Sequence, residues 1–251
     1  MFVIKLSVCI DAVYSGKNFI ESMREVKALG YDAFEFWEWW NKDIEQIDAA
    51  RKELNMQVAA LCTKFISLVD PSVRDKYMEG LKETIPIAKK LGCKTIISQV
   101  GDELIGVSRE KQHESLVCGL KEAAPLLEAE GLTLVIEPLN LTVDHAGYYL
   151  WESDEAGDII AKVSSPNVLM LFDIYHQQIM EGDVVRRSIK HMKSIGHMHA
   201  AGTPGRHELD DGELNYTYIF KALKEAGYKG YVGLEYFPTR EEKDGLTIAK
   251  G

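Results

Sequence analysis

Residues 132–140 read LTLVIEPLN, an aliphatic run that ends on Glu137 and is followed by a proline. Residues 231–238 read YVGLEYFP and repeat the arrangement, with Glu235 close to the point where the chain breaks. Short runs of β-branched, aliphatic and aromatic residues that end at turn residues are typical of buried strands. A carboxylate at the end of such a strand is costly unless hydrogen bonds, a salt bridge or a metal ion compensate its charge. The two runs therefore predict buried strands that end at a polar site.

The same type of run recurs along the whole chain and alternates with longer amphipathic stretches. We expect strands at residues 3–10, 33–37, 57–63, 95–101, 132–139, 168–175, 195–201 and 231–237. We expect helices at residues 18–30, 71–92, 108–131 and 215–230, with the third capped by Ser108 and only a stub at residues 240–250. Eight such alternations in about 250 residues predict a single-domain (β/α)8 TIM barrel over residues 1–251.

The rival fold is an open doubly wound α/β sheet. That fold usually carries a glycine-rich phosphate-binding turn after its first strand. Here the corresponding segment, residues 11–18, reads DAVYSGKN and lacks that fingerprint. The sequence therefore favours the closed barrel.

Composition narrows the class of protein. The chain has 29 basic and 39 acidic residues and a net charge of −10, which disfavours a nucleic-acid partner. No apolar run is long enough to span a membrane, and the N-terminal segment fits a first strand better than a signal peptide. We expect buried, reduced thiols and a cytoplasmic setting, because no CxxC pair occurs among the four cysteines, Cys9, Cys62, Cys93 and Cys118.

Polar residues collect at the ends of the last four predicted strands. Strand 168–175 carries Asp173, with His176 just beyond it, and strand 195–201 carries His197 and His199 on one face. Barrel active sites lie at the carboxyl ends of the strands. A single acid there is more often a cap or an ion-pair partner, but four such residues on consecutive strands favour a shared metal ion.

The predicted ligands are Glu137, Asp173, His199 and Glu235. Three carboxylates and one imidazole suit Mn²⁺, Mg²⁺ or Co²⁺, with Zn²⁺ as an alternative, and leave positions open for a substrate.

These segments also carry a family resemblance. VIEPLN, LFDIYHQQIMEGD, IGHMHAAGTPGRHELDDGELNY and GYVGLEYFP resemble the hydroxypyruvate isomerases, within a superfamily of xylose isomerase-like barrels that includes ketose 3-epimerases and endonuclease IV. The resemblance is strong in the second half and looser in the first. It implies the same four metal ligands, Glu137 and Glu235 as the acid/base pair, and substrate contacts from His176, His197 and Arg206. Some hydroxypyruvate isomerases have glutamine where this chain has His199, which makes this site more like that of an epimerase.

The expected reaction moves a carbonyl along a short substrate through an enediolate, with one glutamate removing a proton from carbon. The expected substrate is hydroxypyruvate, tartronate semialdehyde or a similar hydroxy-oxo acid, whose carboxylate Arg206 would bind. A ketose 3-epimerase is the main alternative, and an endonuclease IV-like nuclease is a weaker one. The oligomeric state stays open, including a homo-oligomer.

Other polar and aromatic residues have less certain roles. Residues 34–40, FEFWEWW, form either an aromatic wall over the substrate or ordinary packing, with Trp37, Trp39 and Trp40 as the candidates. Asn140 is a candidate to orient Glu137, with a purely structural role as the alternative, and His145 is a candidate lid residue. Further residues that we expect to be structural, solvated or without a role are Lys64, Gln99, His113, His191, His207 and Glu208.

Overall fold

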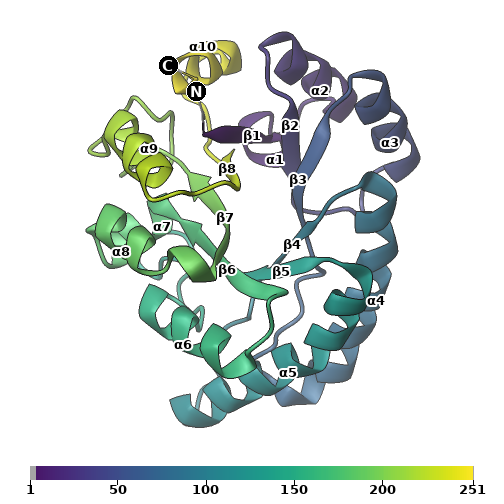
Figure 1. Ribbon diagram of the computed structural model, residues 1–251, viewed down its shortest axis with the longest axis vertical. Helices are drawn as coiled ribbons and strands as arrows, with labels where there is room; N and C mark the ends of the chain where they lie inside the picture. The colour runs from purple at the N-terminus through teal and green to yellow at the C-terminus, as the bar shows by residue number, and fades with distance from the viewer. Residues whose placement is uncertain (1–3, 251) are drawn as a thin grey trace.

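The computed structural model describes residues 4–250, and its eight parallel strands close into one barrel in chain order, with β8 pairing with β1 (Figure 1). This confirms the predicted (β/α)8 TIM barrel. The strands are β1 (Lys5–Cys9), β2 (Ala33–Phe36), β3 (Gln57–Cys62), β4 (Thr95–Ser98), β5 (Thr133–Ile136), β6 (Val168–Asp173), β7 (Ile195–Ala200) and β8 (Tyr231–Leu234). Val3, at the start of the first predicted strand, lies outside the described residues.

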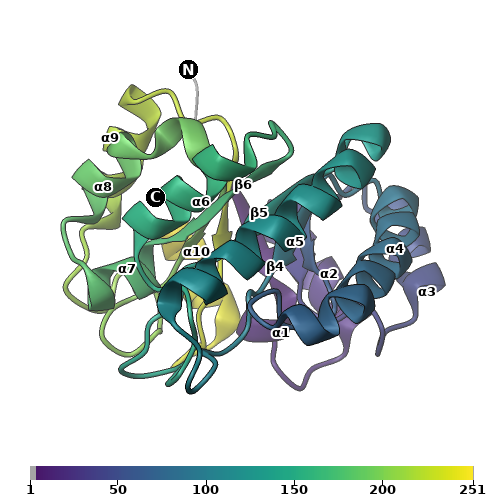
Figure 2. The ribbon, with the colours of Figure 1, turned by 90° about the horizontal axis from the view of Figure 1, so that it is seen from below.

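Helices surround the strands as an outer ring (Figures 1 and 2). They are α1 (Ile10–Val13), α2 (Phe19–Ala28), α3 (Ile44–Glu53), α4 (Arg74–Leu91), α5 (Arg109–Glu130), α6 (Ser153–Val163), α7 (Ile174–Met180), α8 (Val184–Lys190), α9 (Tyr216–Glu225) and α10 (Glu242–Ala249), with 3₁₀ turns η1 (Pro71–Val73) and η2 (Met192–Ser194).

Each of the eight predicted strands ends one to three residues early in the structure. Strand β5 ends at Ile136 and β8 at Leu234, so Glu137 and Glu235 each lie one residue beyond the paired segment. Strand β6 ends at Asp173, because its carboxylate caps α7, which begins at Ile174. Hydrophobic patterning does not show where ladder pairing stops, which is why the sequence extended these strands into the rim of the barrel.

The helix predictions need three corrections. The segment predicted as a helix over residues 215–230 is helical only over Tyr216–Glu225, as α9. The segment that begins at Pro71 opens with a 3₁₀ turn, and α4 starts only at Arg74. The expected C-terminal stub is a helix of eight residues, α10, whose buried Leu246 packs against the core. The Ser108 cap is confirmed, since its side chain accepts a hydrogen bond from the Lys111 amide.

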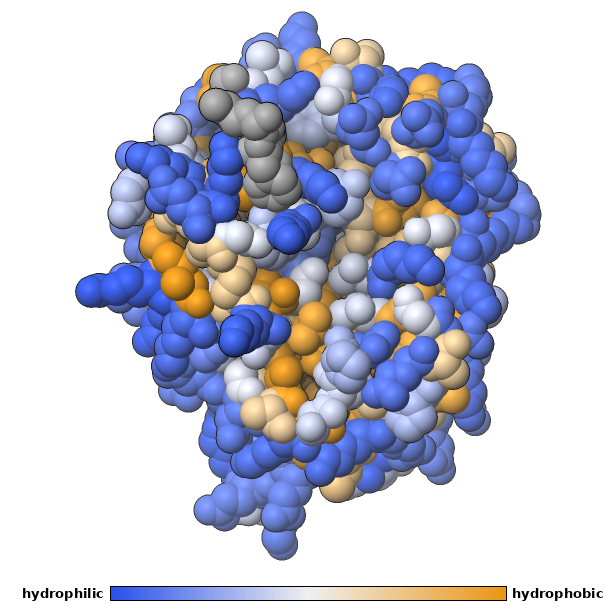
Figure 3. All heavy atoms as spheres, in the orientation of Figure 1, coloured by the Kyte–Doolittle hydropathy of each residue, from blue (hydrophilic) through white to orange (hydrophobic). Residues whose placement is uncertain are grey.

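The apolar residues divide into two groups, as strand alternation requires. The larger group fills the space between strands and helices, and a small one, made of Ala60, Cys62, Ile97, Val135 and Leu171, lies separate from it on β3 to β6. In the space-filling view, hydrophilic residues cover the periphery and apolar residues gather along the middle of the face (Figure 3). The small cluster leaves the rest of the barrel interior to polar side chains.

All four cysteines are free thiols, as expected. Cys9, Cys62 and Cys93 are buried, but Cys118 is exposed on α5, so the prediction of four buried thiols is wrong at that position. Helical periodicity puts Cys118 on the outer face of α5. Among residues 4–250, none of the helices combines the length and the apolar character that crossing a membrane requires.

Candidate active site

The four predicted metal ligands converge at the carboxyl-terminal mouth of the barrel. Nδ1 of His199 lies 3.7 Å from Oε1 of Glu137, 4.0 Å from Oδ2 of Asp173 and 3.4 Å from Oε2 of Glu235. All four side chains are buried. Four consecutive strands, β5 to β8, supply them, so the barrel itself sets their spacing.

The start of α7 aims the Asp173 carboxylate. Its Oδ1 accepts hydrogen bonds from the backbone amides of Tyr175 at 2.7 Å and His176 at 3.2 Å. Its Oδ2 is thereby left facing the two imidazoles, 3.6 Å from Nε2 of His176. A helix N-terminus thus holds one carboxylate oxygen and presents the other to the site.

Burial and the neighbouring charges drive the ionisation of these groups in different directions. Burial, with the nearby Glu137, raises the pKa of Asp173 to about 7. Burial opposes ionisation of Glu235 too, but the charges of His199 and Arg206 outweigh it and hold the pKa of Glu235 well below its usual range. The pKa of His199 is raised well above its ordinary value, because Glu235 and Glu35 overcome the effect of burial. Two carboxylates of one cluster, Asp173 and Glu235, therefore differ in how strongly they hold a proton.

Unpartnered polar atoms mark the centre of this cluster. Glu137 Oε1, His176 Nε2 and His199 Nδ1 are buried and have no hydrogen-bond partner within residues 4–250. Atoms of Glu137, Asp173, His176 and Glu235 lie close enough together to surround one metal ion. Buried polar atoms without partners are costly, and a cation would compensate the Glu137 oxygen and an imidazole lone pair among them. The arrangement can therefore hold a divalent metal.

Arg206 reaches the site from the loop after β7. Its Nη2 lies 2.5 Å from Oε2 of Glu235, and its guanidinium faces the rings of Tyr175 at 5.4 Å and Phe237 at 5.7 Å. Arg206 has a φ of 56°, a left-handed conformation that few residues other than glycine adopt. The loop thus holds the arginine in a strained conformation against a carboxylate, as functional sites often do.

A cavity of about 200 Å³ opens beside the cluster. Apolar side chains form part of its wall, including Phe65 and Leu139, and the polar lining residues are Gln99, Glu137, His145, His176, His199, Arg206 and Glu235. Trp37 also lines it and donates a hydrogen bond of 2.6 Å from Nε1 to Oε1 of Glu235.

The aromatic segment at residues 34–40 has mixed roles. Only Trp37 of the three tryptophans lines the cavity. Trp39 bonds to Thr84 of α4 at 3.2 Å, and Trp40 packs edge-on against Phe65 with ring centroids 5.2 Å apart. Trp37 therefore fits the interpretation as a cavity wall, and Trp39 and Trp40 fit the interpretation as ordinary packing.

Several residues lie away from their expected places. His197 is 1% exposed, does not line the cavity and directs Nε2 at Oε2 of Glu35, 3.0 Å away. Asn140 bonds to His176 rather than to Glu137. Gln99 and His145, by contrast, do line the cavity.

The remaining polar candidates lie outside the cavity. Lys64 forms an ion pair with Glu83 of α4. Glu208, expected in a solvated loop, is buried and accepts hydrogen bonds from Thr239.

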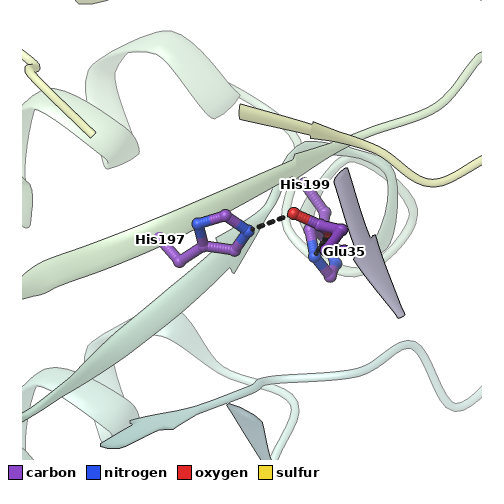
Figure 4. Close-up of side chains that lie close together, drawn as sticks. All are labelled: Glu35, His197 and His199. Carbon is purple, nitrogen blue, oxygen red and sulfur yellow. Dashed lines mark hydrogen bonds and ion pairs between the residues drawn. The ribbon is translucent and has the colours of Figure 1, made fainter. Parts of the chain in front are cut away.

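Sequence reasoning missed the role of Glu35. This glutamate of β2 is 1% exposed, accepts a hydrogen bond from Ser7 Oγ at 2.7 Å, and lies between His197 and His199 (Figure 4). Burial opposes its ionisation, but the two histidines lower the pKa of Glu35 to about 2. Gly233 leaves room for it, because a Cβ there would collide with its carboxylate. The sequence did contain a signal for this role, because Glu35 is an acidic residue between Phe34 and Phe36 in a predicted buried strand.

Comparison with known proteins identifies the family of the chain. Residues 23–250 match the family described as xylose isomerase-like TIM barrel. The hydroxypyruvate isomerase of Escherichia coli is 29% identical over 97% of both chains. The 2-oxo-tetronate isomerase of Cupriavidus necator is 44% identical over 49% of this chain and 47% of its own length.

Solved structures agree on the fold. An AP endonuclease, family 2, from Brucella melitensis superposes with a TM-score of 0.92 at 28% identity over 97% of both chains. An L-ribulose 3-epimerase superposes with a TM-score of 0.81 at 21% identity, covering 100% of this chain and 92% of its own, which shows a shared fold. The chain belongs to the xylose isomerase-like TIM barrel family, in the branch that holds the hydroxypyruvate isomerases.

Proposed function

We propose that this protein is a metal-dependent isomerase that interconverts hydroxypyruvate and tartronate semialdehyde, or acts on a similar short hydroxy-oxo acid. The observation that carries the proposal is the position of Arg206, beside Glu235 and on the wall of a small cavity that also contains the carboxylate cluster. The names of the relatives from E. coli and C. necator, which are isomerases of oxo acids, support the same reaction class.

One divalent ion, Mn²⁺, Mg²⁺ or Co²⁺ with Zn²⁺ as the alternative, would be held by Glu137, Asp173, His199 and Glu235. Oxygen-rich donor sets with one imidazole suit these ions. When bound, the metal supplies Lewis acidity that stabilises negative charge on the substrate oxygens. The unpartnered buried atoms at the centre of the cluster support this assignment.

The two glutamates move the proton. Glu137 has a carboxylate oxygen, Oε1, without a hydrogen-bond partner in the described chain, whereas Trp37 and Arg206 contact the two oxygens of Glu235. We assign removal of the proton from carbon to Glu137, because its carboxylate is less engaged by neighbouring donors than that of Glu235. Glu235, or Glu137 itself, returns the proton to the neighbouring carbon, and the hydroxyl proton passes to the former carbonyl oxygen, which together complete the shift of the carbonyl.

Arg206 and the size of the cavity support the proposed substrate class. A guanidinium binds a carboxylate with two parallel hydrogen bonds, which a neutral ketose cannot accept in the same way. The cavity volume of about 200 Å³ is below the roughly 300–1,000 Å³ typical of sites for drug-sized ligands, so it favours a short substrate.

A ketose 3-epimerase is the second candidate, because His199 gives the site an epimerase-like ligand set. A nuclease is disfavoured by the net charge of −10, since DNA binding depends on basic surface.

Proton exchange in heavy water tests the proposal. The protein with Mn²⁺ is incubated with hydroxypyruvate, tartronate semialdehyde, tetronate-type oxo acids and free ketoses, and deuterium is measured at the carbon next to the carbonyl. Exchange and carbonyl migration on an oxo acid are expected, with no exchange in the Glu137→Gln variant. Exchange on ketoses alone, with inversion of a centre, would instead identify an epimerase.

A further inference from the structure

Two imidazoles face the three carboxylates of the site, and their chemical roles differ. His199 directs Nδ1 at them, and His176 directs Nε2, 3.6 Å from Oδ2 of Asp173. A neutral imidazole has one nitrogen with a lone pair, which can bind metal, and one N–H, which can only donate. The partner of the opposite ring nitrogen decides which one faces the site.

The partners of His176 fix its proton on Nε2. The backbone N–H of Asn140 points at Nδ1 of His176 at 3.3 Å, and the Asn140 side-chain amide lies 2.7 Å from the same atom. A backbone N–H has no lone pair, so Nδ1 must accept. His176 therefore presents an N–H to the cavity, and that atom has no partner in residues 4–250.

The orientation of the Asn140 amide is fixed by its own contacts. Its Oδ1 accepts hydrogen bonds from the amides of Val143 and Asp144, each at 3.0 Å. Its Nδ2 donates to Oδ2 of Asp144 at 2.6 Å. A flipped amide would place its nitrogen against two N–H donors, so the amide group that faces His176 is the NH₂.

The ring nitrogen of His199 that faces away from the site contacts a hydrogen-bond acceptor, whereas that of His176 contacts donors. Nε2 of His199 lies 2.7 Å from Oε1 of Glu35, whose other oxygen accepts from Ser7 and faces His197. A carboxylate accepts but does not donate, so it keeps a proton on Nε2 and leaves Nδ1 as the nitrogen that can give up its proton and bind a metal ion held by the carboxylate cluster. The contact is bent away from a straight hydrogen bond, since both atoms lack a conventional partner in the described chain.

We propose that Glu35 and Asn140 assign opposite roles to the two imidazoles, with Glu35 holding His199 as a metal ligand through Nδ1 and Asn140 holding His176 as a hydrogen-bond donor to a substrate oxygen. Both are positioning residues, and His197 is a further support of Glu35. The inference rests on the metal site of the proposed function and not on the identity of the substrate.

Ring-nitrogen spectroscopy tests the inference without any substrate. The full-length protein, labelled with ¹⁵N-histidine and loaded with Mg²⁺, is examined by long-range ¹H–¹⁵N correlation, and signals are assigned with His176→Gln. We expect His176 to carry its proton on Nε2 and to have an unprotonated Nδ1 that accepts from Asn140. A proton on Nδ1 of His176 in the wild-type protein would overturn the inference, whether or not any variant folds.

A double variant replaces the side-chain donor that contacts Nδ1 of His176 with an acceptor. Asn140→Asp combined with Asp144→Asn keeps one donor and one acceptor between the two positions and presents a carboxylate to Nδ1 of His176. We expect a carboxylate at the 2.7 Å position of the amide to outweigh the longer 3.3 Å contact of the backbone N–H, so that the proton moves to Nδ1 and the exposed lone pair on Nε2 adds a second ¹⁴N coupling to the Mn²⁺ spin-echo spectrum. An unchanged proton position and unchanged coupling in a folded double variant would contradict the role of Asn140.

The Glu35→Gln variant tests the proposed role of Glu35 in holding His199 as a metal ligand. We expect Mn²⁺ to bind about 10–100-fold more weakly, the usual effect of removing a partner behind a metal-binding histidine. Glu208→Gln is the matched control, a buried glutamate outside the cavity, and should leave Mn²⁺ affinity unchanged. Unchanged affinity in Glu35→Gln would overturn the role of Glu35, as would two Mn²⁺ per chain, because Glu35, His197 and His199 would then form a second metal site.

These readouts are separable from the proposed reaction. If the nitrogens and the metal affinity behave as expected but no oxo acid exchanges its proton, the proposed substrate class fails and the positioning inference stands. If activity on oxo acids is found with the proton on Nδ1 of His176, the positioning inference alone fails.

Discussion

Nη2 of Arg206 lies 2.5 Å from Oε2 of Glu235, in the same cluster that is proposed to hold the metal. The arginine thus neutralises a carboxylate that lies 3.4 Å from His199 and is at the same time on the wall of the cavity. Any change at Arg206 therefore acts on both the glutamate and the substrate, and experiments must separate the two effects.

Arg206→Ala and Arg206→Lys separate them by a comparison of substrates. For an oxo acid we expect Arg206→Ala to weaken apparent binding by about 2–4 kcal/mol, because the substrate carboxylate loses its partner, and Arg206→Lys to recover only part of this. The effect through Glu235 is common to all substrates. Measured kcat/KM on an oxo acid and on a ketose should therefore fall unequally, and equal losses would favour the epimerase.

Glu137→Gln and Glu235→Gln test proton transfer. We expect each variant to lose at least about a hundredfold in turnover, the scale typical of a general acid or base. Turnover is measured at saturating Mn²⁺, so that weaker metal binding does not account for the loss. Full activity in either saturated variant would exclude that residue as a proton carrier.

His199→Ala and Asp173→Asn test the metal site. Each removes one donor from a set of four, so the metal content of the purified protein should fall below the one ion per chain expected for the wild type. Metal analysis of dialysed protein measures this. If both variants retained the wild-type content, the assignment of the ligands would be wrong.

The metal-free protein should become less stable as the pH rises. The folded-state pKa of Asp173, about 7, is above its unfolded value of 3.8, so its contribution is complete below about pH 4 and is lost as the pH rises through about 7. The melting temperature of metal-free wild type, relative to that of Asp173→Asn, should fall between about pH 5 and about pH 8. Added Mn²⁺ should raise the wild-type value more at pH 8 than at pH 5. A difference independent of pH would contradict the raised pKa.

Strand periodicity located much of this site. Glu137, Asp173, His199 and Glu235 could be placed at one end of the barrel because acids and a histidine followed aliphatic runs on consecutive strands. The exact strand ends could not be predicted, since they depend on where neighbouring strands stop pairing. The role of Asn140 was also missed, because its partner His176 is 36 residues away on α7 and only the tertiary fold brings the two together.

The sequence by itself determined the closed barrel, the outer and inner faces of its strands, and the collection of ligand-type residues at one end, because these follow from local alternation and chain order. Only the tertiary structure decided what each ring nitrogen faces. Glu35 and His197 are 162 residues apart on strands that do not pair, and they meet across the barrel interior. Hydrogen-bond direction depends on distances of a few ångströms between such distant residues, and no local pattern in the chain encodes it.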